Sequence, residues 1–124
     1  MTNDFTLPSG KKVVFRNSVK YGDVRKYEMK KTSLYKIKED DKIDFQSYAI
    51  AMAESAGLLV FALCESVDGK PVTETTHDEM ELFDGGALHN EVKMRYDEII
   101  EKKSSQEMKL RPLNSSEKTN QKEE

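Results

Sequence analysis

The chain has 124 residues, 35% of them charged, with a formal net charge of -3 at pH 7 and a mean hydropathy of -0.75. This length suits one modest domain and leaves little room for a second. A single cysteine, Cys64, excludes a disulfide within the chain and is typical of a reducing compartment. The first residues lack a basic segment followed by an apolar one, so we expect no secretory signal and a cytoplasmic location.

Charge is unevenly distributed along the chain. Basic residues outnumber acidic ones in residues 1–40, and the reverse holds in residues 41–103. The two regions could attract each other within one molecule or between neighbouring copies. A basic face that binds nucleic acid is a further alternative, although the lysines are dispersed and the whole chain is acidic. That face would comprise Lys11, Lys12, Arg16, Lys20, Arg25, Lys26, Lys30 and Lys31.

Two short β-prone runs open the chain, at residues 5–7 and 13–15. Pro8 and Gly10 lie between them and are turn residues, because proline fixes φ and glycine leaves it free. The pattern predicts a β-hairpin over about residues 4–16. A lone hairpin is marginally stable in water, so this one must pack on an apolar surface or pair with another strand.

Two helices are predicted next. Val24, Tyr27 and Leu34 recur at helical spacing and indicate an amphipathic helix over about residues 23–36. Asp44 is a candidate N-cap for a second helix over about residues 45–65. The apolar run within it extends only from Ala49 to Cys64 and contains an acid, so we expect a helix outside the membrane.

The segment after the apolar helix begins with a turn signal at Asp68-Gly69. Thr76 to Glu79 has the pattern of a capping box and predicts a short helix over about residues 77–83. Two glycines then break it, and a last helix over about residues 87–103 is expected. Its apolar stripe, with Met80 and Phe83 of the short helix, would complete the core: Leu88, Val92, Tyr96 and Ile99.

The predicted fold class is mainly α with a small N-terminal β-hairpin (α+β). A single domain over residues 1–103 is followed by residues 104–124, which are polar, contain helix breakers and are expected to be a disordered tail. The sequence therefore predicts one compact helical domain.

No pattern of catalytic or metal-binding residues is present in the sequence. His77 and His89 are the only histidines, and they lie on different predicted elements without the spacing of a zinc pair. The acids near His77 suit the N-terminus of a helix, whose dipole favours negative charge. There is no glycine-rich phosphate loop and no nucleophile elbow. We expect a protein without catalytic, metal or cofactor sites, and we expect Cys64 to be buried and inert.

The apolar helix is the most informative segment. From residue 58 onward it is apolar on every side, and such a helix must be enclosed. Either the rest of the chain encloses it completely, or an uncovered part forms an interaction site. The residues predicted to serve as a client or oligomer interface are Met52, Leu58, Leu59, Val60, Phe61 and Leu63.

The order of segments resembles a known family. "FTLPSGKKVVFR", a basic amphipathic stretch, the apolar helix, "DGKPVT" and "THDEMELFDGGALHNEVKMRY" follow one another over about residues 4–103. This layout resembles the small tail assembly chaperones of tailed bacteriophages. The resemblance implies a non-enzymatic, largely helical protein of the host cell cytoplasm, forming homo-oligomers.

The resemblance also implies partners. Such a chaperone would bind hydrophobic segments of the tape-measure protein and assist assembly of the tail-tube protein around it, without a cofactor, a membrane or nucleic acid. The predicted N-terminal hairpin keeps a second role open, that of a structural virion component of the neck, baseplate or tail-completion complex.

Overall fold

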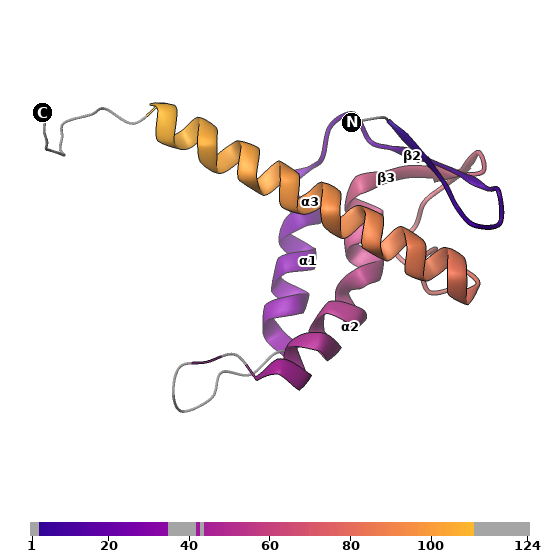
Figure 1. The fold of residues 1–124 in the computed structure, drawn as a ribbon, viewed down its shortest axis with the longest axis horizontal. Coiled ribbons are helices and arrows are strands. Elements are labelled where there is room, and N and C mark those ends of the chain that lie inside the picture. The colour runs from indigo at the N-terminus through magenta and orange to yellow at the C-terminus, as the bar shows by residue number, and fades with distance from the viewer. Residues whose placement is uncertain (1–2, 35–41, 43, 111–124) are drawn as a thin grey trace, which may run out of the picture. The chain divides into compact units, whose positions relative to one another are not determined.

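The computed structural model describes residues 3–34, 42 and 44–110, with side chains described up to residue 102. It confirms the α+β class: within the described residues, three helices accompany four short strands (Figure 1). The chain divides into two compact units, Met1–Lys93 and Met94–Glu124. The boundary lies inside the last helix.

The N-terminal hairpin is confirmed. β1 (Asp4–Thr6) pairs antiparallel with β2 (Lys12–Phe15), and Asp4 lies opposite Val14. The loop between them closes through Gly10, whose amide donates to the Leu7 carbonyl at 2.8 Å. Gly10 has a φ of 96°, in the left-handed region that glycine adopts without steric cost. Leu7 is buried at the start of this loop.

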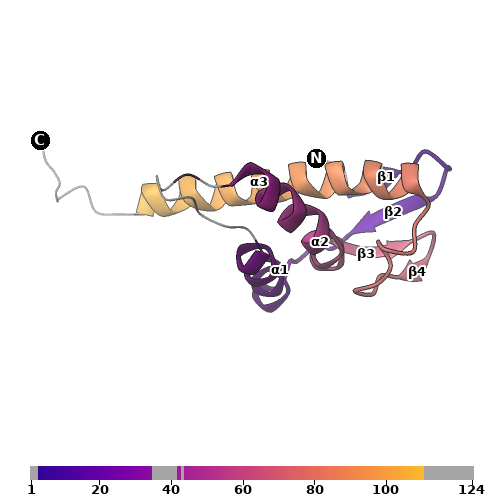
Figure 2. The same cartoon turned by 90° about the horizontal axis from the view of Figure 1, so that it is seen from below.

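The structure contains a second hairpin that the sequence did not predict. β3 (Cys64–Val67) and β4 (Lys70–Pro71) follow directly after the apolar helix, and β3 pairs antiparallel with β2. The four strands form one sheet in the order β1-β2-β3-β4 (Figure 2). Asp68 and Gly69 both have positive φ, 52° and 82°, as a two-residue hairpin turn with right-handed strand twist requires. The predicted helix end at residue 65 is therefore wrong.

Two helices pack side by side as a helical hairpin, as both views show (Figures 1 and 2). They are α1 (Tyr21–Leu34) and α2 (Phe45–Leu63), and residues 35–36 of the predicted first helix lie outside the described residues. The Asp44 cap is confirmed, since its carboxylate accepts from the Ser47 amide at 3.0 Å. Tyr27 joins the helices by a contact of its hydroxyl with the Met52 sulfur at 3.8 Å.

The predicted helix over residues 77–83 is absent. The Thr76 hydroxyl accepts from the Thr73 amide at 2.8 Å, so it does not cap a helix through Glu79, and residues 74–79 form turns. The next helix, α3 (Leu82–Leu110), begins later and runs through both glycines. Phe83, predicted to be in the core, is 79% exposed.

The predicted disordered tail is partly wrong. Residues 104–110 continue α3 as helix, while residues 111–124 lie outside the described residues. Within the unit Met1–Lys93, the core draws on both hairpins, on α2 and on the start of α3. Helix α1 adds Tyr27 to this core. The most deeply buried aliphatic and aromatic side chains are Leu7, Val13, Phe15, Tyr27, Leu59, Val60, Leu63, Leu88 and Val92.

Candidate functional site

The N-terminal half of α2 exposes large apolar side chains. Phe45 is 85% exposed and Ile50 is 53% exposed, and Ala49 and Ala53 are exposed as well. Positions 45, 49 and 53 are four residues apart, and position 50 adjoins them, so the four lie on one side of the helix. We call Phe45, Ala49, Ile50 and Ala53 the apolar α2 face.

Most of the residues predicted as an interface lie elsewhere. Leu59 and Val60 are fully buried, Leu63 is 2% exposed and Met52 is 9% exposed. These four side chains build the core and are not available at the surface, which corrects the prediction that they form an interface. Leu58 and Phe61 are partly exposed. The uncovered part of α2 is therefore about two to three turns earlier in the chain than expected.

Phe61 has a specific neighbour. The Arg16 Nε donates to the Phe61 carbonyl at 3.1 Å, and the guanidinium carbon lies 5.3 Å from the centre of the Phe61 ring. Because the ring is only partly buried, Phe61→Ala is expected to cost less than the roughly 3–5 kcal/mol of a fully buried aromatic ring.

The eight residues of the predicted basic face lie on several different elements. Lys11 and Lys12 belong to the N-terminal hairpin, whereas five others lie on or beside α1. Lys31 is engaged: its Nζ lies 2.8 Å from the Glu28 carboxylate and 5.0 Å from the centre of the Tyr27 ring. Burial alone would lower the pKa of Lys31, but the Glu28 hydrogen bond and neighbouring charges outweigh it and raise that pKa.

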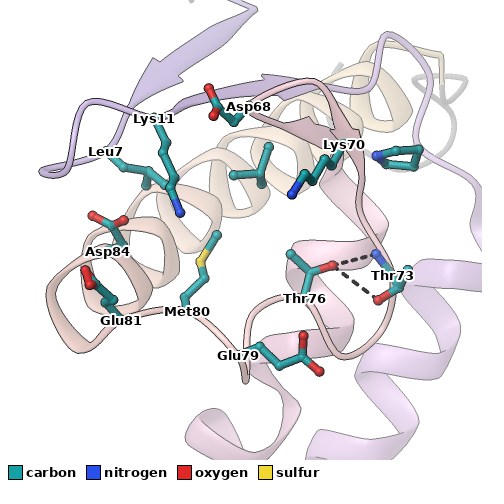
Figure 3. A pocket seen from close by; sticks show the side chains of 12 residues that line it. Leu7, Lys11, Asp68, Lys70, Thr73, Thr76, Glu79, Met80, Glu81 and Asp84 are labelled. Carbon is teal, nitrogen blue, oxygen red and sulfur yellow. Dashed lines mark hydrogen bonds between the residues drawn. The ribbon is translucent and has the colours of Figure 1, made fainter.

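A cavity of about 440 Å³ lies between the two hairpins and the start of α3 (Figure 3). The amino groups of Lys11 and Lys70 point into it, and Thr76 is held at its edge by two hydrogen-bonded contacts with Thr73. The lining combines both signs of charge with apolar side chains and contains no cysteine, serine or histidine. The lining residues are Leu7, Lys11, Val67, Asp68, Lys70, Pro71, Thr73, Thr76, Glu79, Met80, Glu81 and Asp84.

One side of the cavity is closed by a contact that the sequence did not reveal. Asp84 is 5% exposed and accepts from the Ser9 amide at 3.0 Å and from the Ser9 hydroxyl at 2.6 Å. The first turn of α3 is thereby fixed to the loop of the N-terminal hairpin. The two residues are 75 positions apart, so no local pattern signals the contact.

The two histidines lie close together in the structure. Their ring centres are 6.0 Å apart in an edge-to-face arrangement, and the His77 Nε2–H donates to the Gly85 carbonyl at 2.8 Å. The His89 Nε2 is buried without a hydrogen-bond partner. Burial lowers the pKa of His89, and the neighbouring His77 and Lys93 add to this effect. Burial, together with His77 and Lys93, therefore favours the neutral form of His89.

This predicts a dependence of stability on pH. Because the pKa of His89 is lower in the folded chain than its ordinary value of 6.5, the unfolded chain binds a proton first as pH falls. The contribution of neutral His89 to the free energy of unfolding is complete above pH 6.5, the ordinary pKa of histidine, and is lost as the pH falls below that value. The midpoint of thermal unfolding, measured from pH 8 to pH 5, should fall more steeply for the wild-type chain than for His89→Gln. Equal slopes would contradict the assignment.

The described residues offer little for metal chemistry. Among them, no group of three or more His, Cys, Asp or Glu side chains is placed to hold a metal ion. Cys64 is fully buried, as predicted. α2 has the length and apolarity of a membrane span, but half of that segment is buried inside the protein, as in many core helices.

In comparisons with known proteins, no family model, no curated protein and no solved structure matches this chain.

Proposed function

We propose that this chain is a non-enzymatic assembly chaperone that covers a hydrophobic helical segment of another protein. The observation that carries the proposal is the apolar α2 face, which exposes Phe45 and Ile50 on a helix whose other half is core. An exposed apolar patch on a small, highly charged protein is the usual mark of a protein interaction site. An amphipathic helix laid against this face would supply the missing cover.

The resemblance to tail assembly chaperones gives this proposal a specific form. The client would be a hydrophobic segment of a tape-measure protein, captured in the host cytoplasm before the tail-tube protein assembles around it. Small side chains at Ala49 and Ala53 suit such a client, since they allow a second helix to approach α2 closely. Neither a cofactor nor a nucleotide enters the proposed mechanism, which consists of binding and release.

A single substitution tests the client site. Burial of an isoleucine side chain contributes about 1.5–3 kcal/mol, so Ile50→Glu should weaken binding of a labelled amphipathic helical peptide by about tenfold or more. Fluorescence anisotropy with a synthetic leucine-rich peptide, or with a helical segment of the tape-measure protein, provides the measurement. Stability should change little, because Ile50 is 53% exposed.

Phe83→Glu is the matched control, since Phe83 is also apolar and exposed but lies at the start of α3. Its binding should equal that of the wild-type chain. Equal weakening by both substitutions, or a wild-type chain that binds neither peptide, would contradict the proposed site.

A second candidate is favoured by the sheet. β1 and β4 are its edge strands, and edge strands can pair with a neighbouring chain during polymerisation. A structural virion component would use them in this way. The two candidates differ in one observation: a structural component is present in stoichiometric amounts in mature particles, whereas an assembly chaperone is absent from them.

A further inference from the structure

The outer side of α1 is basic. Tyr21, Arg25 and Met29 recur every four residues and share one stripe, with Lys26 and Lys30 beside it. Tyr21 is 75% exposed and Met29 is 63% exposed, and the three basic side chains are exposed as well. We call these five residues the basic α1 surface. It carries three positive charges and two large side chains with apolar parts.

A stripe of the opposite character lies on α3, in the unit that begins at Met94. Met94, Asp97 and Glu101 recur at spacings of three and four residues, and Ile100 adjoins them. Met94 is 50% exposed and Ile100 is 43% exposed, and both acids are exposed. We call these four residues the acidic α3 stripe.

We propose that the acidic α3 stripe of one copy binds the basic α1 surface of a second copy. The two stripes match in length, about 12 Å from Tyr21 to Met29 and about 11 Å from Met94 to Glu101, at a rise of 1.5 Å per residue. Antiparallel alignment of the two helices sets Arg25 opposite Asp97. The same alignment places Met29 next to Met94, since the residue directly opposite Met29 is Lys93, and it sets Tyr21 opposite Glu101.

Existing contacts of the basic α1 surface do not compete strongly with this pairing. The Arg25 guanidinium lies 5.8 Å from the centre of the Tyr21 ring. The Lys26 Nζ lies 3.6 Å from the Glu74 carboxylate, and about half of each of these two side chains is exposed. Exposed ion pairs are worth little and exchange readily. Two helical stripes bury less than a standard interface, so the association should be weak and sensitive to salt.

This inference is independent of the proposed client binding, because it uses α1 and α3 and leaves the apolar α2 face free. Sedimentation equilibrium of the wild-type chain at low salt should show a mass that rises with concentration from 14.2 kDa toward at least twice that value. In about 1 M salt, where the Debye length is about 3 Å, the mass should stay close to that of the single chain.

Charge reversal tests the pairing itself. Arg25→Glu with Lys30→Glu makes the α1 surface acidic, and Asp97→Lys with Glu101→Lys makes the α3 stripe basic. Each double variant should remain a single chain at low salt, because its two surfaces then repel. An equimolar mixture of the two variants should associate again, because each supplies the complement of the other. All four positions are exposed, so thermal unfolding should show that both variants fold.

The mixture decides between the alternatives. If it does not associate, or if either variant alone associates as the wild-type chain does, the proposal is overturned. A wild-type chain that stays single at every concentration and binds labelled duplex DNA through Arg25 and Lys30 would overturn it in favour of a nucleic-acid surface. Peptide binding by the apolar α2 face should be unchanged in both variants, so failure here leaves the proposed function standing.

Discussion

Tyr27→Ala should lower the free energy of unfolding by about 3–5 kcal/mol, the range for removing a fully buried aromatic ring. Tyr27 is 1% exposed and is the one buried residue of α1. Its ring lies under the Lys31 ammonium, and its hydroxyl contacts the Met52 sulfur. Loss of this side chain leaves a cavity between α1 and α2. Urea unfolding followed by far-UV circular dichroism gives the measurement.

Tyr21→Ala is the control, because it removes the same side chain from the same helix at a position that is 75% exposed. Its effect on the free energy of unfolding should be within about 0.5 kcal/mol. Comparable losses for the two variants would show that α1 is not anchored through Tyr27. A loss for Tyr27→Ala below about 1 kcal/mol would show the same.

The helical hairpin could be predicted because its signals are local. Val24, Tyr27 and Leu34 mark the inner side of α1 by spacing alone, and Asp44 caps α2 as its position suggested. The start of α1 was misplaced by two residues, which is ordinary for helix ends. Local periodicity and capping chemistry were sufficient for these elements.

The second hairpin could not be predicted from the same signals. Cys64 to Val67 continues an apolar helix in sequence, and no breaker separates the helix from the strand. The strand forms because β2 offers a pairing edge, and Val13 lies opposite Val67 in the sheet. Tertiary pairing thus overrides helix propensity at this point. The Asp68-Gly69 turn was recognised, but its strands depend on a partner about 50 residues earlier in the chain.

The candidate site was located only approximately. The sequence left open whether the rest of the chain encloses α2 completely or leaves part of it uncovered, and the structure shows exposed apolar residues on this helix. Which half is covered could not be read from the sequence. Val60 and Leu63 lie next to β3 and become core, whereas Phe45 and Ile50 lie near the other end and remain exposed. Hydrophobicity alone does not distinguish these two ends.

The start of α3 shows the reverse failure, in which a plausible local signal was wrong. Thr76 and Glu79 match the sequence pattern of a capping box, but the Thr76 hydroxyl accepts a hydrogen bond from the Thr73 amide instead. Gly85 was expected to break a helix, yet it lies in the first turn of α3, where His77 Nε2 bonds to its carbonyl. The N-terminus of α3 is instead held by the contact between Asp84 and Ser9. A rule based on local spacing cannot predict a contact between residues so far apart in the chain.

That remote contact has a measurable consequence. Asp84→Asn should lower the free energy of unfolding by about 1.5–3 kcal/mol, the range for hydrogen bonds to a charged group. The carboxylate is 5% exposed and accepts two hydrogen bonds from Ser9, whereas the amide offers a single, uncharged acceptor oxygen. Glu81→Gln is the control, since Glu81 also lines the cavity but is exposed, and it should change stability by less than about 1 kcal/mol.

A double-mutant cycle separates the Ser9 contact from other effects of the Asp84 substitution. Ser9→Ala removes the 2.6 Å hydroxyl bond and keeps the amide bond, so its own effect should be smaller than that of Asp84→Asn. Once the carboxylate is gone, loss of the hydroxyl should matter less, and the two effects should fall short of additivity by about 0.5 kcal/mol or more. Strict additivity would mean that Ser9 and Asp84 act separately, and the N-terminal hairpin would then need another explanation for its attachment to α3.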